Sequence, residues 1–357
     1  MKPICITMGD PAGLGPELII RLLNQLNPGK SPALVLIGDR AILQYALERF
    51  GGKKAKKWFK SAKVLDEKSF PNAESRIPNS ESPIPNSQLL NSSLNILNLS
   101  RINPEKIQIE RGSAKHGKAS WKYIEAGVKL CLSGICDGMI TLPVNKESLL
   151  RAGCPYPGHT DLLAHLDGKK SVVMMMVSGK IRVALLTHHI PLKAVPEKIE
   201  KGEIVSCLKI IDHSLKTDFG ISNPKIGVLG LNPHAGEDGR IGDEELKIIL
   251  PAIKQAQAQG INAFGPIAGD TAFVRAKKRE FDALLAMYHD QGISPLKALG
   301  FEKVVNVTLG LSFIRTSPGH GTAYDIAWQG IADPRSLFSA FNLAKRLIII
   351  RGAKERS

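Results

Sequence analysis

The chain has 357 residues, of which 43% are hydrophobic, and its mean hydropathy is −0.04. This is long enough for one large or two medium domains with a buried core, and it is typical of a soluble globular protein. It contains no run of about 18 apolar residues, which argues against a membrane-spanning helix. The N-terminal residues lack a signal-peptide pattern, so we expect a cytoplasmic protein.

The net charge of +15 raises the possibility of nucleic-acid binding. Four lysines gather at residues 53–57, but aromatic residues make up only 5% of the chain. No helix-turn-helix, RNP or zinc-finger pattern is present, so we interpret the charge as a solvated lysine-rich surface. A basic nucleic-acid-binding protein is kept as an alternative of another class.

The five cysteines are scattered and form no C-x-x-C pair. This distribution argues against a disulfide framework and against a cysteine-type zinc site. Most of them are expected to act as small core hydrophobes.

Short apolar runs alternate with longer amphipathic segments throughout the chain. Strands are predicted at residues 4–7, 33–37, 138–142, 172–177, 183–186, 226–229, 283–287 and 304–307. Helices are predicted at residues 16–26, 119–132, 199–215 and 244–258. The alternation predicts an α/β fold with mainly parallel sheets, in which ligands bind at the carboxyl ends of the strands.

Residues 8–17 read MGDPAGLGPE and follow the first predicted strand. They open a helix and therefore look superficially like a dinucleotide-binding fingerprint. The glycine spacing does not match G-x-G-x-x-G, and a proline lies inside it, so a standard Rossmann site is not supported.

Residues 71–100 are rich in Ser, Asn and Pro, and the sequence IPNS occurs twice within them. This composition predicts a flexible surface insertion with no packed role. A partner-binding segment is the alternative.

A polar turn, GHTD, occupies residues 158–161. Thr160 or Asp161 could cap the helix that follows. Alternatively, His159 and Thr160 could present hydrogen-bond donors to an anionic substrate. Spacing alone leaves both interpretations open.

Three later loops each place a histidine after a predicted strand. They read THHIPL (residues 187–192), GLNPHAGE (230–237) and YHDQG (288–292). Imidazole suits zinc and related divalent metals, and three such ligands leave coordination positions for substrate oxygens. A single histidine in such a place is usually a hydrogen-bonded loop residue, so it is the recurrence that favours a metal site.

Polar residues also interrupt the apolar stretches further along the chain, at Lys297, Asn306 and Arg315. Asn306 lies within VVNV, where an unpaired amide would be costly. Lysine and arginine side chains can hold a phosphate or carboxylate. For Lys297 and Arg315, surface exposure is the alternative.

Taken together, these segments resemble the 4-hydroxythreonine-4-phosphate dehydrogenase family. The matching segments are MGDPAGLGPE (8–17), TLPVNKESL (141–149), GHTDLLA (158–164), HIPL (189–192), GLNPHAGEDGRIGDEE (230–245), GDTAF (269–273), YHDQG (288–292) and SPGHGTAYDIA (317–327). They run in order over almost the whole chain, and the segment 71–100 lies outside them.

The resemblance implies a two-domain isocitrate/isopropylmalate-dehydrogenase-like fold with the active site in the interdomain cleft. We expect a first domain of residues 1–145 plus 300–357 and a second domain of residues 146–299. It further implies a homodimer that holds one divalent metal (zinc, magnesium or cobalt) in each site, with one ligand contributed across the dimer interface. The implied ligands are His189, His234 and His289.

The reaction that the resemblance implies is the NAD- or NADP-linked oxidation of 4-phosphohydroxy-L-threonine in pyridoxine 5'-phosphate synthesis. The implied substrate-binding residues are His159, Thr160, Lys297, Asn306 and Arg315. The adenosine end of the cofactor would be received by Gly319, His320, Gly321, Thr322 and Asp325. Candidates for accepting the alcohol proton are Lys297, Asp290 and Asp270.

Two residues depart from the family pattern. His188 stands where a threonine is expected and could compete for the metal, and Trp328 stands where the related loop often has glycine. The nearest alternative function is a paralogous dehydrogenase of phosphothreonate, phosphoerythronate or a cyclic diol. A non-catalytic protein that binds a partner through residues 71–100 is a further alternative.

Overall fold

The computed structural model describes residues 1–66, 92–107, 113–156 and 158–355. The chain forms two compact units: Met1–Gly168 with Ser312–Ile348, and Lys169–Leu311 with Ile349–Ser357. Both combine a mainly parallel sheet with helices, which confirms the predicted α/β class. In the described residues, no helix has the length and apolar character needed to cross a bilayer. The cytoplasmic location stays a prediction.

The described residues of the first unit form six strands in the order β3-β4-β2-β1-β5-β12, and the pairs between neighbours are all parallel. These strands are β1 (Ile4–Thr7), β2 (Leu34–Gly38), β3 (Lys63–Asp66), β4 (Leu94–Asn98), β5 (Gly138–Thr141) and β12 (Ile314–Pro318). The helices are α1 (Gly15–Gln25), α2 (Arg40–Phe50), α3 (Lys53–Lys60), α5 (Ala114–Leu132), α6 (Lys146–Arg151), α7 (His159–Leu166) and α12 (Arg335–Lys354).

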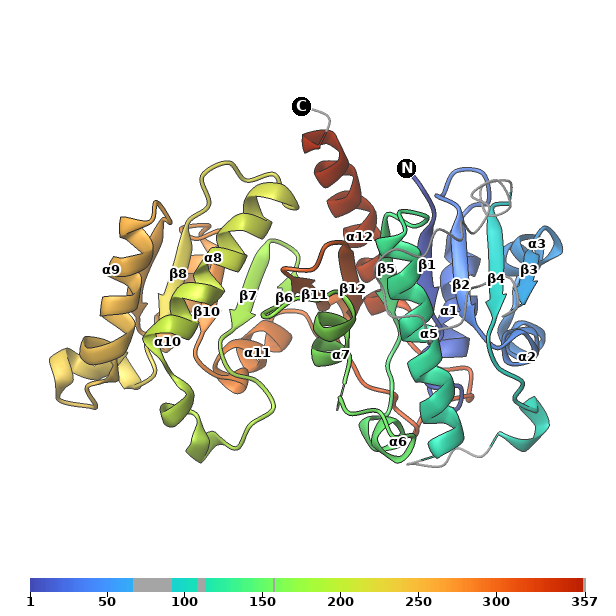
Figure 1. Cartoon of the computed structure of the whole chain (residues 1–357), viewed down its shortest axis with the longest axis horizontal. Coiled ribbons are helices and arrows are strands. Elements are labelled where there is room, and N and C mark those ends of the chain that lie inside the picture. Colours follow the sequence, from blue (N-terminus) through green and yellow to red (C-terminus); the bar gives the residue numbers. More distant parts are fainter. Residues whose placement is uncertain (67–91, 108–112, 157, 356–357) are drawn as a thin grey trace. The chain divides into compact units, whose positions relative to one another are not determined.

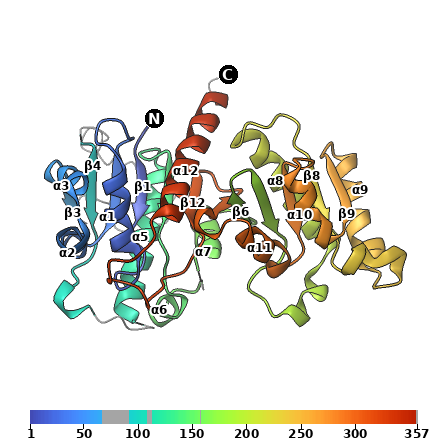
Figure 2. The same ribbon diagram turned by 180° about the vertical axis from the view of Figure 1, so that it is seen from behind.

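Helices cover both faces of this sheet, which accounts for the apolar runs of its central strands β1 and β2. Figure 1 shows α5 across one face, where it contacts β1, β2 and β5. Figure 2 shows α1 and α12 across the opposite face. A parallel sheet covered on both sides buries every side chain of its central strands. All residues of β1 and β2 are accordingly buried.

The second unit has the strand order β11-β6-β7-β10-β8-β9. The pairs β7–β10, β10–β8 and β8–β9 are parallel, whereas β6 runs antiparallel to both of its neighbours. The strands are β6 (Val173–Ser178), β7 (Ile181–Leu185), β8 (Ile226–Leu229), β9 (Ala263–Ile267), β10 (Ala283–Ala286) and β11 (Val305–Leu309). The helices are α8 (Lys201–Thr217), α9 (Leu250–Ala258), α10 (Gly269–Lys277) and α11 (His289–Ala298). Helix α8 covers one face in Figure 1, and α10 and α11 cover the other in Figure 2.

The two boundaries between the units differ from those expected at residues 145 and 300. Helices α6 and α7 pack against α5, so the first unit continues to Gly168. Strand β11 pairs with β6, which keeps residues up to Leu311 in the second unit. The last residues also differ, because Arg351 Nε lies 2.7 Å from Asp218 Oδ1 and belongs with the second unit.

The prediction that residues 71–100 have no packed role is wrong for their last part. Residues 71–91 lie outside the described residues, but Leu94–Asn98 form β4, which pairs with both β2 and β3. Leu94, Ile96 and Leu97 are buried. The run was hidden because asparagine and serine surround its apolar residues.

The predicted role of the cysteines as core residues is confirmed for Cys5, Cys131, Cys136 and Cys154, which are buried free thiols. Cys5 Sγ lies 3.9 Å from Cys131 Sγ. Burial raises the pKa of the Cys5 and Cys131 thiols, which keeps them protonated.

Candidate functional site

In the first unit, the polar segments begin at the carboxyl ends of three neighbouring parallel strands. Strand β5 lies between β1 and β12 in the sheet. Strand β1 leads into residues 8–17, β5 leads into residues 142–149, and β12 leads into residues 319–325. Carboxyl ends of neighbouring parallel strands share one edge of a sheet, which is where ligands bind in such folds. These three segments therefore start side by side.

Arg315 lies inside β12 and is only 2% exposed. Its Nη2 donates to Thr141 Oγ1 at 2.6 Å, and its Nε donates to the same oxygen at 3.2 Å. Burial lowers the pKa of Arg315 to about 9. Surface exposure, the alternative for this residue, is wrong. A buried guanidinium is stabilised by an anion, so this position suits a phosphate or carboxylate.

His159 is the first residue of α7 and lies near Arg315. The helix is capped by Gly158 without a side-chain hydrogen bond, so the capping role considered for Thr160 or Asp161 is wrong. His159 Nε2 is buried and has no hydrogen-bond partner. Burial, with a smaller effect of the Arg315 charge, lowers the pKa of His159 well below its usual value. The neutral ring therefore keeps a polar nitrogen available for a ligand.

In the second unit, three neighbouring strands deliver the three histidines, as the sequence predicted. Strand β10 lies between β7 and β8, and all three are parallel. The turn after β7 is tied to the turn after β10, because Thr187 donates to Met287 O through N at 3.2 Å and through Oγ1 at 2.7 Å. The ring centroids of His189 and His289 are 5.8 Å apart.

The described part of the chain brings two of the predicted ligands together, but not three. No group of three His, Cys, Asp or Glu side chains in it is arranged to hold a metal ion. The ring of His188 lies 5.1 Å from that of His189, edge to face. His189 itself has a φ of +53°, a left-handed conformation that non-glycine residues seldom adopt.

Asp290 and Gln291 hold the turn that carries His289. The carboxylate of Asp290 lies 2.7 Å from His289 Nδ1, a contact that orients the ring and selects its tautomer. Gln291 Oε1 accepts from Met287 N, and its Nε2 donates to Gly230 O, each at 2.7 Å. Gln291 thereby joins the turns after β10 and β8. In the sequence, only the position of Gln291 within the segment YHDQG pointed to this residue.

His234 begins a turn of six consecutive residues with positive φ, from +42° to +88° (residues 234–239). Each non-glycine residue in this region costs about 1–3 kcal/mol, so the surroundings must enforce the conformation. The buried carboxylate of Glu245 does this, because it accepts from Leu231 N and Asn232 N, both at 2.7 Å. Glu245 ends the matching segment 230–245, but its residue type alone did not indicate this role.

The remaining predicted residues lie on separate elements of the second unit. Lys297 is half-buried on α11, the helix that begins at His289. Asp270 is exposed in the first turn of α10. Asn306 lies on β11, and its Oδ1 is buried without a hydrogen-bond partner. A buried amide oxygen of this kind loses its hydration unless a ligand replaces it.

The predicted cofactor residues lie in an irregular segment between β12 and α12. Gly319 N donates to Ser336 Oγ at 3.1 Å, and Thr322 O accepts from Leu14 N at 3.1 Å. Gly321 and Asp325 are exposed, whereas His320 is half-buried.

Comparison with known proteins identifies the class, which is an α/β oxidoreductase. A 4-hydroxythreonine-4-phosphate dehydrogenase from Sulfurihydrogenibium sp. is 42% identical over 98% of this chain and 100% of its own length. A D-threonate 4-phosphate dehydrogenase from Salmonella typhimurium is 37% identical over 97% of this chain and 99% of its own. The crystal structure of 4-hydroxythreonine-4-phosphate dehydrogenase from Klebsiella pneumoniae has a TM-score of 0.79 at 35% identity and covers 97% of this chain and 98% of that one.

The family is equally clear. The model described as "Pyridoxal phosphate biosynthetic protein PdxA" matches residues 30–344. The chain belongs to the PdxA family, as the resemblance predicted. This assignment replaces the alternatives of a nucleic-acid-binding protein and of a non-catalytic protein.

Proposed function

We propose that the chain oxidises 4-phosphohydroxy-L-threonine to 2-amino-3-oxo-4-phosphooxybutanoate, with NAD and a divalent metal. The secondary alcohol loses hydride to NAD and a proton to the protein. The product, a β-keto acid, then releases CO2 and takes up a proton to give 3-amino-2-oxopropyl phosphate. The role in pyridoxine 5'-phosphate synthesis follows from this product and from the family.

The observation that carries the proposal is the pair formed by the buried guanidinium of Arg315 and the buried Nε2 of His159. A guanidinium and an unpartnered imidazole nitrogen, both removed from water, form a site for a small anion. Phosphate and carboxylate both match the planar guanidinium. Thr141 holds Arg315 from the protein side through two hydrogen bonds. We assign the phosphate or carboxylate of the substrate to this pair, with Thr160 beside it.

Residues of the second unit would contact the polar groups of the substrate and move its proton. The unpartnered Oδ1 of Asn306 would accept a hydrogen bond from the substrate. The carboxylate of Asp290 contacts Nδ1 of His289. We therefore propose that Asp290 orients the His289 ring and does not accept the alcohol proton. Lys297 shares its helix with His289, and we favour it over the exposed Asp270 as the acceptor of the alcohol proton.

The histidine turns fit a divalent metal of the zinc type as an incomplete ligand set. His189 and His289 supply two neighbouring imidazoles, and the carboxylate of Asp290 supports one of them, as is common in zinc sites. A metal held there would polarise the substrate alcohol and lower its pKa. NAD would accept the hydride.

We propose that a second copy of the chain completes the set with its His234. Exposed apolar side chains follow two of the histidines along the chain: Ile190 (37% exposed) and Leu192 (69%) after His189, and Ile241 (38%) and Leu246 (47%) after His234. Exposed large apolar side chains that follow polar site residues in the chain suit a surface that a second subunit covers.

The direct test is NADH formation by the purified protein on 4-phosphohydroxy-L-threonine. We expect turnover to stop with a chelator and to return when zinc, cobalt or magnesium is added back. The rates of turnover with NADP and with NAD are compared to determine the cofactor preference. Sedimentation of the purified protein determines its oligomeric state. No NADH from this substrate, with the metal supplied, would overturn the proposal.

A second candidate function is oxidation of D-threonate 4-phosphate. The relative from Salmonella typhimurium that carries this name covers 97% of the chain. This substrate keeps the phosphate and the secondary alcohol, so the pair of His159 and Arg315 would serve it equally. A higher kcat/KM on this compound, on erythronate 4-phosphate or on a cyclic diol would replace the first assignment.

A further inference from the structure

Residues 319–334, between β12 and α12, contain no helix or strand, and we call them the 319–334 loop. Ala323 and Trp328 adopt positive φ values of +43° and +64° within it. Such conformations persist only where neighbouring groups enforce them. The resemblance to the family implies that Gly319, His320, Gly321, Thr322 and Asp325 receive the adenosine end of NAD, so whatever fixes this loop would also shape that cofactor site.

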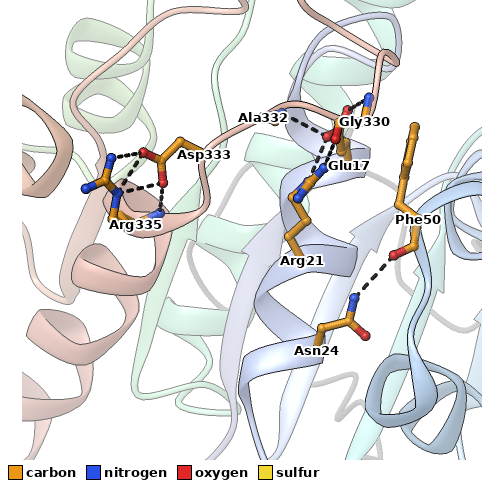
Figure 3. Close-up of polar contacts among 8 residues, drawn as sticks. All are labelled: Glu17, Arg21, Asn24, Phe50, Gly330, Ala332, Asp333 and Arg335. Carbon is orange, nitrogen blue, oxygen red and sulfur yellow. Dashed lines mark hydrogen bonds and ion pairs between the residues drawn. The ribbon is translucent and has the colours of Figure 1, made fainter.

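The first anchor of the loop is Glu17 on α1, which is fully buried. Its Oε2 accepts from Gly330 N at 3.2 Å, and its Oε1 accepts from Ala332 N at 3.0 Å. Its partner Arg21 donates from Nε to Glu17 Oε1 at 2.7 Å and also donates to Gly330 O (Figure 3). The ion pair thus binds both polar groups of the Gly330 backbone.

The second anchor is the turn that precedes α1. Asp10, also fully buried, accepts from Tyr324 Oη at 2.6 Å through Oδ2 and from Ala12 N at 2.9 Å through Oδ1. Leu14 N donates to Thr322 O at 3.1 Å. Residues 8–17 therefore contact the start of the loop through Tyr324 and Thr322 and its end through Gly330 and Ala332.

This placement accounts for the glycine at position 13. A Cβ built there would lie 3.2 Å from both Cβ and O of Thr322. The space would be tighter than ordinary van der Waals contact, so glycine permits the close approach of the two segments. The glycines that give residues 8–17 their superficial likeness to a dinucleotide-binding fingerprint thus include Gly13, which fits against the loop.

Trp328 is held by a separate apolar contact. Its ring centroid lies 5.6 Å from that of Tyr45 and 6.0 Å from that of Phe50, and it is 9% exposed. The phenylalanine is itself tied to α1, because Asn24 Nδ2 donates to Phe50 O at 3.2 Å (Figure 3). The departure from the family pattern at Trp328 therefore packs against α2.

We infer that Asp10 and Glu17 are positioning residues for NAD, which act by holding the 319–334 loop in its binding conformation. The inference rests on the proposed function, since it takes the loop as the cofactor site. A carboxylate can accept several hydrogen bonds at once, and its removal leaves buried backbone donors without acceptors. A loop that is no longer fixed must be ordered when NAD binds, and this cost weakens binding without altering the reacting groups.

The test is Glu17→Gln, which keeps the shape of the side chain but removes its charge and part of its capacity to accept hydrogen bonds. We expect KM for NAD to rise about tenfold, with kcat and KM for the phosphorylated substrate changed less than about twofold. Hydrogen–deuterium exchange should increase in peptides that cover residues 319–334. A general loss of stability would not produce this division between the two KM values.

The matched control is Asp333→Asn, at the end of the same loop and outside residues 319–325, which would receive NAD. The carboxylate of Asp333 bonds the exposed side chain of Arg335 and its backbone N–H (Figure 3). We expect this variant to lower stability slightly and to leave KM for NAD unchanged. If Glu17→Gln does not fold, Tyr324→Phe removes only the hydroxyl bonded to Asp10 and carries the same expectation.

An unchanged KM for NAD in a folded Glu17→Gln or Tyr324→Phe protein overturns the inference and leaves the proposed function standing. An equal rise in the Asp333→Asn control also overturns it. Absence of turnover with any nicotinamide cofactor in the unaltered protein overturns both.

Discussion

The side chain of Glu245 accepts hydrogen bonds from both the backbone and the side chain of Asn232. The distances are 2.7 Å from Asn232 N to Oε1 and 2.9 Å from Asn232 Nδ2 to Oε2. Asn232 stands two residues before His234, at the entrance to the left-handed turn. The buried carboxylate of Glu245 thus fixes the backbone conformation between β8 and His234, a proposed metal ligand.

Replacing Glu245 with alanine should therefore weaken metal binding without touching a ligand. Groups that orient metal ligands are typically worth about 10- to 100-fold in metal affinity. The free energy of unfolding should also fall by about 1–3 kcal/mol, because buried donors lose their acceptor. Titration of the metal-free protein with zinc against a chromophoric chelator measures the first effect.

The control for this experiment is Asp243→Asn. Asp243 forms an exposed ion pair with Lys247 close by in the chain, so its loss should leave zinc affinity unchanged. Equal zinc affinity in Glu245→Ala and the unaltered protein would show that the turn does not depend on Glu245.

The neighbouring histidines 188 and 189 provide a second pair of matched variants. The ring of His189 is the one paired with His289, at 5.8 Å between centroids. We expect His189→Ala to lower zinc affinity at least about tenfold, and His188→Thr to change it less than about twofold. Loss of zinc in His188→Thr would identify His188 as a ligand and remove His189 from that role.

Arg315→Lys should raise KM for the phosphorylated substrate at least about tenfold, although the charge is kept. Lysine cannot reproduce the planar group that bonds Thr141 twice and that, in the proposed function, also binds the substrate anion. KM for NAD should not change. Arg151→Lys, at an exposed position on α6, is the control, and unaltered substrate KM in Arg315→Lys would contradict the anion site.

Substrate binding should also depend on pH through Arg315. Burial lowers the pKa of this guanidinium to about 9 in the free protein, and a bound anion would raise it again. Binding is therefore complete below that pKa and weakens as the pH rises through it, by up to about tenfold per pH unit. Calorimetric titration with substrate between about pH 7 and pH 10 measures this, and constant affinity over the range would speak against an ionised Arg315 in the complex.

The sequence predicted the strands that are buried by both layers of helices, because these read as unbroken apolar runs. The run LVLI in β2 is an example. Strand β12 was not predicted, since Arg315, Thr316 and Ser317 look like part of a turn. Its polar side chains are buried because they find partners: Thr316 Oγ1 donates to Ala340 O at 3.0 Å, and Arg315 donates to Thr141.

The residues that would bind metal and substrate were predictable because their side chains carry the chemistry. The residues that hold the loops in place could not be predicted from their side-chain chemistry. Glu245 acts on a residue 13 positions away, and Glu17 acts on Ala332, which is 315 positions away. Their partners are backbone N–H groups, which every residue except proline has. No pattern of residue types can therefore indicate such a contact before the fold is known.

Strand β5 pairs with β1 on one side and with β12 on the other. During translation, β5 is synthesised long before β12, because almost all residues of the second unit lie between these strands in the sequence. Until residues 314–318 emerge from the ribosome, β5 presents an open, apolar edge that can pair with another polypeptide. Translation that halts within the second unit should therefore release aggregating fragments, and chaperones that shield such edges should bind the growing chain during this interval.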